Sequence, residues 1–192
     1  MADRFSALAV AGLLFLLAGP AAATTIHVPA GEPTVQAGID AAAPGDTVEV
    51  ACGTYFEHHV VMKSGVVLRS ATGDPACVTI DAERLDRVLH CQGMNSDTKV
   101  EGFTLVNGLS TESGCVWCVF STMTIENCVI QDNEGVYDSP GIGLFQASPT
   151  IRGCVFRNNT TAGAAPGHNR GGGIYIQNQC FPTIEDLSLI HI

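Results

Sequence analysis

The sequence predicts an all-β protein, a right-handed parallel β-helix (solenoid) of about five to six turns with a short N-terminal capping helix. Two observations carry this prediction. A segment of alternating apolar and polar residues recurs at a nearly constant spacing. In addition, only 15% of the residues are charged whereas 21 are glycine, which favours strands joined by many bends over helices.

The repeat is clearest between two segments that begin at Thr124 and Thr150, 26 residues apart, and weaker copies begin at Lys99 and Thr183. Apolar residues alternate with polar ones inside each copy, which is the period of a strand. One turn cannot bury its apolar face alone, so successive turns must stack about 4.8 Å apart around one core. The predicted columns are Val100, Ile125, Ile151, Ile184; Phe103, Cys128, Cys154, Leu187; and Leu105, Ile130, Phe156, Leu189.

Each copy contains a bend and is preceded by a second strand. The bend falls on residue types that tolerate unusual backbone angles, namely Gly102, Asn127, Gly153 and Asp186. The preceding strands carry the equivalent pairs Val116 and Cys118, Ile142 and Leu144, and Ile174 and Ile176. Two earlier segments, Thr47 to Val50 and Val66 to Arg69, have the same strand character.

A short helix is predicted from Thr34 to Ala43. Thr34 can cap it, and Val35, Ile39 and Ala42 form one apolar stripe. Such a helix would cover the first turn and protect its unpaired strand edges. We therefore expect an N-terminal strand and capping helix in residues 24–45 and the β-helix in 46–192. The pattern stops inside a turn after Leu189, so we expect the coil to be truncated there and the chain to be the N-terminal part of a longer protein.

Residues 1–23 have the layout of a secretory signal peptide. Arg4 supplies a positive charge, an apolar run extends from Ala7 to Ala18, and three alanines end at Ala23. The run is shorter than the roughly 20 apolar residues that span a bilayer. We expect cleavage near Ala23 and a secreted, extracellular or cell-surface protein whose mature part does not insert into the membrane.

All eight cysteines lie in the part expected to be exported, where disulfides can form. The sequence leaves the pairing open. Cys52 with Cys77 is the favoured pair, because each lies in a loop that leaves a strand of adjacent early turns. Cys118, Cys128 and Cys154 fall in inward columns, where thiols pack as small apolar groups.

The net charge of −10 argues against a nucleic-acid partner, which requires a basic face. Nine Lys and Arg residues face nineteen Asp and Glu residues, and no basic cluster falls on a repeating face. This balance disfavours an acidic substrate.

The stretch Pro33 to Val50, followed by Gly53-Thr-Tyr-Phe-Glu57, resembles the opening of bacterial secreted right-handed β-helix repeat proteins of the pectate-lyase-like superfold. The resemblance covers residues 24–189. It implies the fold but no single activity, because the superfold hosts lyases, hydrolases, esterases, adhesins and structural spikes. Pectin methylesterases share this opening, yet of their later motif only Gln131-Asp132 has a counterpart here.

Four residues are candidates for catalysis. Asp132 with Arg157 is the arrangement that a calcium-dependent lyase of this superfold would imply, with Ca²⁺ as its cofactor. His168 and Arg170 resemble the site of polygalacturonase-like hydrolases, although those need two or three carboxylates at fixed separations. No other cofactor or metal is indicated. For His168 and Arg170 an inserted polar loop is the favoured interpretation.

A structural role is favoured for the asparagines that follow the strands. Asn107, Asp132 and Asn158 occupy matching places just past a strand, as do Asn133 and Asn159. Such residues accept left-handed geometry, and stacked amides hydrogen-bond along a coil. The favoured function is a scaffold or a module that interacts with polysaccharide, cell-surface glycan or another surface. The alternative is a polysaccharide lyase or glycoside hydrolase.

Overall fold

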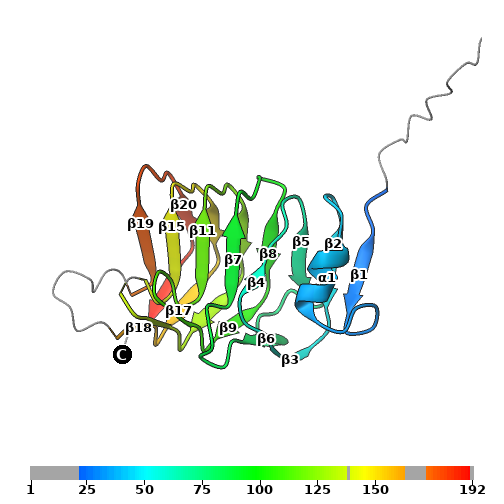
Figure 1. Ribbon diagram of the computed structural model, residues 1–192, viewed down its shortest axis with the longest axis horizontal. Coiled ribbons are helices and arrows are strands. Elements are labelled where there is room, and N and C mark those ends of the chain that lie inside the picture. The colour runs from blue at the N-terminus through cyan, green and yellow to red at the C-terminus, as the bar shows by residue number, and fades with distance from the viewer. Residues whose placement is uncertain (1–21, 138, 163–171, 191–192) are drawn as a thin grey trace, which may run out of the picture.

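The computed structural model describes residues 22–137, 139–162 and 172–190, and in these ranges the chain forms a parallel β-helix. Its strands stack from the blue N-terminal end to the red C-terminal end (Figure 1). Residues 1–21 of the predicted signal peptide lie outside the described residues. His168 and Arg170 also lie outside them. No helix in the described ranges is long and apolar enough to cross a membrane.

Strands in all four sheets pair in parallel with strands of neighbouring turns. The seven-stranded sheet contains, in spatial order, β1 (Thr25–Val28), β2 (Thr47–Val50), β5 (Val67–Ser70), β8 (Lys99–Glu101), β12 (Thr124–Glu126), β16 (Thr150–Arg152) and β20 (Thr183–Glu185). The six-stranded sheet contains β3 (Gly53–Phe56), β6 (Val78–Asp81), β9 (Thr104–Val106), β13 (Val129–Gln131), β17 (Val155–Arg157) and β21 (Ser188–Ile190).

The other two sheets are shorter along the coil. The five-stranded sheet contains β4 (Val60–Val61), β7 (Leu89–Gln92), β11 (Val116–Val119), β15 (Ile142–Phe145) and β19 (Ile174–Gln177). A three-stranded sheet is formed by β10 (Leu109–Ser110), β14 (Glu134–Gly135) and β18 (Thr160–Thr161). Figure 1 looks onto the five-stranded sheet, with β7, β11, β15 and β19 side by side.

The register confirms the predicted columns. Ile125 pairs with Val100 on one side and with Ile151 on the other, and Ile130 lies between Leu105 and Phe156. Because every second residue of a strand points inward, these columns fill the tube with apolar side chains. The predicted inward cysteines, Cys118, Cys128 and Cys154, are all buried in the same core.

The bends adopt the left-handed backbone that the sequence predicts. The φ angles of Asn127 and Asp186 are both 51°, and those of Gly102 and Gly153 are 77° and 61°. A positive φ is costly for most residues but not for glycine, and asparagine and aspartate tolerate it better than other side chains. One residue therefore turns the chain from the seven-stranded into the six-stranded sheet.

Helix α1 (Val35–Ala41) caps the first turn, and Thr34 is its N-cap as predicted. It packs on β1, β2 and β4, and the predicted stripe of Val35, Ile39 and Ala42 is buried. The Glu57 carboxylate accepts hydrogen bonds from the Val35 and Gln36 amides at 2.7 and 2.9 Å. Glu57, the last residue of the Gly53–Glu57 motif, therefore holds the cap in place.

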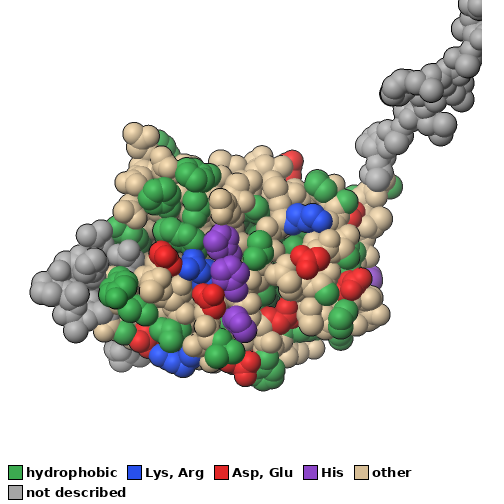
Figure 2. All heavy atoms as spheres, in the orientation of Figure 1, with side chains coloured by type: hydrophobic (Ala, Val, Ile, Leu, Met, Phe, Trp, Pro, Cys, Tyr) green, Lys and Arg blue, Asp and Glu red, His purple; other side chains and the backbone are tan. Residues whose placement is uncertain are grey.

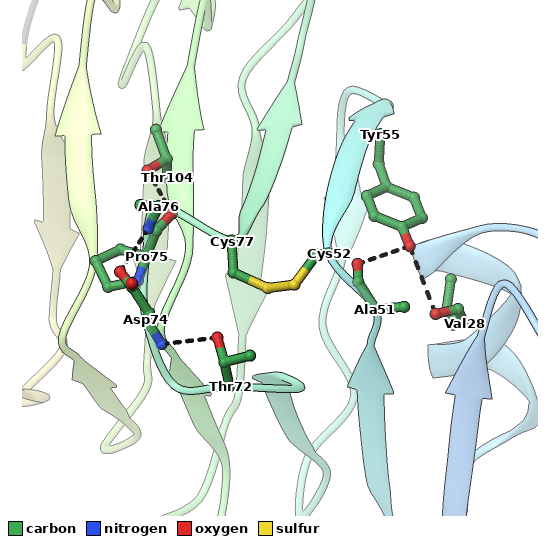
Figure 3. Close-up of a disulfide and its surroundings, with 10 residues drawn as sticks. All are labelled: Val28, Ala51, Cys52, Tyr55, Thr72, Asp74, Pro75, Ala76, Cys77 and Thr104. Carbon is green, nitrogen blue, oxygen red and sulfur yellow. Dashed lines mark hydrogen bonds between the residues drawn. A yellow bond between two sulfur atoms is a disulfide. The ribbon is translucent and has the colours of Figure 1, made fainter.

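The predicted disulfide joins Cys52 to Cys77, whose Cα atoms are 4.6 Å apart. It links the loops that precede β3 and β6 (Figure 3). Beside it, the Tyr55 hydroxyl donates to the carbonyl oxygen of Ala51 at 3.0 Å. The disulfide links two successive turns of the coil, whereas the hydrogen bond fixes the start of β3 within one turn.

Candidate functional site

The outer face of the five-stranded sheet carries most of the unusual surface chemistry of the described chain. Leu89, Cys91, Val116 and Cys118 point into the core, so alternation turns His90 and Trp117 outward. Figure 2 shows histidine side chains grouped near the middle of this face, next to acidic and basic ones and flanked by hydrophobic ones.

Three aromatic rings lie next to one another on this face, and we call Trp117, Phe145 and Phe120 the aromatic strip. The ring centroids of Trp117 and Phe145 are 6.4 Å apart, and those of Phe120 and Phe145 are 6.1 Å apart, edge to face. Such spacing is typical of interacting aromatic pairs. Phe120 is 56% exposed, so the strip offers an apolar edge to solvent.

Gly143 makes room for the strip. It is the register partner of Trp117 in the next turn, and a Cβ atom at Gly143 would lie 2.6 Å from Cε3 of the indole. The tryptophan ring therefore occupies the space that a Cβ atom at Gly143 would take, and any side chain at this position would displace it. Residues of two successive turns, on β11 and β15, thus form the aromatic strip together.

The histidines lie beside the strip, in what we call the imidazole cluster: His59, Asp86, Arg87, His90 and Glu112. His59 Nδ1 is 2.9 Å from Asp86 Oδ2, and the His59 and His90 rings are 5.2 Å apart. The backbone N–H of His59 donates to the carbonyl oxygen of Arg87 at 2.7 Å. Stacking of two successive turns therefore brings together residues 27 or more positions apart.

Arg87 is the buried cation of the imidazole cluster. Its side chain donates to the Glu112 carboxylate at 2.7 Å and to the Ser110 hydroxyl at 2.8 Å, whereas its Nε makes no hydrogen bond and lies 3.6 Å from Asp86 Oδ1 as an ion pair. His90 Nδ1 is buried without a hydrogen-bond partner. Buried donors and acceptors of folded proteins are usually hydrogen-bonded, so His90 Nδ1 is an exception that needs an explanation.

The environment lowers the pKa values of three groups in the cluster, Asp86, His90 and Glu112, and the first two lie next to the His59 ring. Burial, reinforced by the positive charge of Arg87, lowers the pKa of His90, so its ring is neutral near pH 7. Partial burial raises the pKa of Asp86, but hydrogen bonds from the Arg87 amide and from His59 outweigh it and leave that pKa below its usual value. Asp86 is therefore a carboxylate that holds the His59 ring through Nδ1.

Acidification is expected to destabilise the fold through His90. Its pKa is lower in the folded than in the unfolded state, so the unfolded chain binds the additional proton as pH falls below about 6.5. We expect the urea midpoint to fall between pH 7.5 and pH 5, and the slope to become shallower in His90→Gln. Equal slopes for the two proteins over this window would contradict the assignment.

The catalytic candidates predicted from sequence lie elsewhere or outside the described residues. Asp132 has a φ of 55° at the end of β13, and its backbone N–H donates to the carbonyl oxygen of Arg157 at 3.2 Å. The Arg157 side chain donates to the Gln131 amide oxygen at 2.5 Å. Both residues belong to the six-stranded sheet, and the structure does not bring them to the imidazole cluster. Among the described residues no group of three or more His, Cys, Asp or Glu side chains forms a metal site.

The asparagines predicted to be structural make contacts along the coil. Asn133 Nδ2 donates to Asn159 Oδ1 at 3.0 Å, and Asn107 Nδ2 donates to both oxygens of Asp81 at 2.9 and 3.0 Å. Asn107 and Asn158 have φ angles of 56° and 52°. In these positions the amides link neighbouring turns, and no ligand is needed to explain them.

Charges on the seven-stranded sheet are paired with one another. Glu126 accepts from Lys99 and from Arg152, each at 2.8 Å, and these hydrogen bonds, Arg152 first, lower the pKa of its carboxyl group. Arg69 pairs with Glu49 at 2.7 Å in the same outward row. The basic side chains of these pairs are therefore already bound to carboxylates of the same sheet. This is expected of a solvated surface and not of a site for an acidic ligand.

The aromatic strip and the imidazole cluster were not predicted from sequence. The alternation that assigned Val116 and Cys118 to the core also implies that Trp117 points outward, and an outward tryptophan is an unusual surface residue. The imidazole cluster had no comparable signal, since His59, Asp86 and Glu112 come from loops outside the repeat.

Comparison with known proteins supports the architecture. Residues 90–190 match the family described as a right handed beta helix region, and this match covers more than half of the 192-residue chain. No significant match was found among curated proteins or among solved structures. The family fits the parallel stacking described above.

Proposed function

Because the chain belongs to the right-handed β-helix family, we propose that it is a secreted or cell-surface module that binds polysaccharide along the outer face of its five-stranded sheet. The observation that carries this proposal is the aromatic strip. The sheet beneath it is held by parallel pairing on both sides of β11 and β15, so the binding surface is preformed.

Sugar rings suit such a surface. A pyranose presents a face of C–H groups that packs on an aromatic ring, while its hydroxyl groups seek hydrogen-bond partners at the edge. Here the half-buried Trp117 offers a ring held over Gly143, and Gln92 and the His59–Asp86 pair offer polar groups nearby on adjoining strands and loops. Because turns repeat along the axis, an extended polymer can follow the stacked strands.

Loss of the indole should weaken binding. Trp117→Ala is expected to weaken polysaccharide binding about tenfold, since the best-placed aromatic anchors of binding surfaces contribute about 1–2 kcal/mol or more. Trp117 is the only tryptophan of the chain, so its intrinsic fluorescence reports binding to the wild-type protein directly. Affinity electrophoresis in gels that contain neutral or acidic polysaccharides allows both proteins to be compared.

Phe56→Ala is the matched control, because Phe56 is 64% exposed and lies on β3 of a different sheet. It should bind as tightly as the wild type. Two results together would refute a glycan site on this face. The wild type, Trp117→Ala and Phe56→Ala would be retarded equally by every polysaccharide, and the tryptophan fluorescence of the wild type would not change when polysaccharide is added.

A second candidate function is a polysaccharide lyase or glycoside hydrolase, and the imidazole cluster favours it. Asp86 fixes the orientation of the His59 ring as a carboxylate does for a general base, and neutral His90 lies 5.2 Å away. Release of reducing ends or of unsaturated sugars from pectin or alginate, abolished in His59→Gln but retained in Phe56→Ala, would establish this activity. Binding without any product would leave the chain a binding module.

A further inference from the structure

Two pairs of buried cysteines occupy matching positions in successive turns of the coil. Cys91 of β7 and Cys118 of β11 are direct register partners. Cys128 and Cys154 each precede a strand residue, and those residues, Val129 and Val155, are register partners as well. All four side chains are fully buried and carry free thiols.

The disulfide already present has the same relation. Cys52 and Cys77 precede Gly53 and Val78, which are register partners in β3 and β6, and their Cα atoms are 4.6 Å apart. This distance lies inside the usual range of about 4.4–6.8 Å for bridged cysteines. The spacing between neighbouring strands is about 4.8 Å, so the coil brings any two matched cysteines into that range.

We propose that Cys91–Cys118 and Cys128–Cys154 are disulfides in the exported protein, so that three bridges staple successive turns of the coil. The inference rests on the proposed export, because an oxidising compartment supplies the oxidant, a protein or small-molecule disulfide. Each bridge forms by loss of two protons and two electrons from two thiols, and the oxidant disulfide is reduced to two thiols. Cys115 and Cys180 remain as thiols.

The bridges must form before the coil closes. A thiolate is the form that attacks a disulfide, and the hydrogen bond with Cys118 together with burial raises the pKa of Cys91 well above its usual value. The hydrogen bond with Cys154 and burial act on the pKa of Cys128 in the same way. A chain that folds in a reducing compartment would therefore bury Cys91 and Cys128 as poorly reactive thiols, and burial of all four side chains in the core keeps an oxidant away from them.

The test counts thiols in the exported protein. The full chain is produced in a bacterial host, recovered from outside the cytoplasm, unfolded in guanidinium without reductant and alkylated. Six cysteines are free in the described fold, and two bridges use four of them, so two alkyl groups are expected by mass spectrometry. Peptide mapping should assign them to Cys115 and Cys180. Six alkyl groups would overturn the proposal.

Single substitutions identify the partners. Cys118→Ala should release Cys91 and give three alkyl groups, whereas Cys115→Ala should give one. Retention of two groups in Cys118→Ala would contradict the Cys91–Cys118 pairing.

Failure of export is distinguished from failure of pairing by a second arm. If the chain stays in the cytoplasm, the proposed export is wrong. The pairing is then tested by refolding the purified reduced chain in a buffer of oxidised and reduced glutathione, where two alkylated cysteines are again expected. Six alkylated cysteines after refolding would refute the pairing whatever the fate of export.

Discussion

Replacing Phe156 with alanine is expected to lower the free energy of unfolding by about 3–5 kcal/mol. The ring is fully buried at the register position between Ile130 and Leu189, and it fills the space beside Gly141, where an added Cβ would lie 3.3 Å from its Cδ1. Removal leaves a cavity that backbone hydrogen bonds on both sides prevent from collapsing. Urea unfolding followed by circular dichroism measures the loss.

The control for this prediction is the same substitution at an exposed site. Phe56→Ala removes a ring that is 64% exposed and should change the free energy of unfolding by no more than about 0.5 kcal/mol. A loss of similar size in both variants would mean that Phe156 does not lie in a continuous apolar column.

Asn133→Ala is expected to lower the free energy of unfolding by about 2–4 kcal/mol, because buried polar groups left unpaired cost about 1–3 kcal/mol each. The side chain is 1% exposed and satisfies three partners. Its Oδ1 accepts from the Gly108 amide at 2.8 Å, and its Nδ2 donates to the Leu105 carbonyl at 3.2 Å and to Asn159 at 3.0 Å. Alanine would leave the buried Gly108 amide without this acceptor and would remove the two hydrogen bonds that Nδ2 donates.

Two further variants sharpen the Asn133 prediction. Asn158 is exposed and precedes Asn159 in the chain. Asn158→Gly removes this exposed amide and places a residue suited to the φ of 52°, so the free energy of unfolding should change by less than about 0.5 kcal/mol. Asn133→Asp keeps the acceptor but buries a carboxylate, so it should be destabilised at pH 7 and recover in part when acid protonates it. Equal stability of Asn133→Ala and Asn158→Gly would refute the ladder.

The fold was predictable from sequence because stacked turns require similar residues at matching positions, and these recur in the sequence as a repeat. A column such as Val100, Ile125 and Ile151 is visible as a repeat, and the bend at Asn127 or Gly153 needs a residue type that the sequence displays. Boundaries differed by one or two residues: the strand predicted from Val66 begins at Val67, and the helix predicted to end at Ala43 ends at Ala41. Strand ends depend on hydrogen bonds to the next turn, which alternation alone does not encode.

The candidate site was less predictable, for a physical reason. His59, Asp86 and Glu112 lie in loops whose lengths differ between turns, so their proximity follows from stacking and not from any spacing in the sequence. Trp117 is different, since its neighbours Val116 and Cys118 already fixed its outward direction. Its contact with Gly143 and Phe145, however, depends on the exact register of β11 with β15.

The most direct test of the stacked coil is a set of proton–proton contacts measured by nuclear Overhauser NMR spectroscopy on the labelled protein. Backbone contacts characteristic of parallel strands should link Ile125 with Val100 on one side and with Ile151 on the other, and Ile130 with Leu105 and Phe156. Contacts between these strands in an antiparallel pattern, or none between residues 26 positions apart, would contradict the β-helix and every inference built on it.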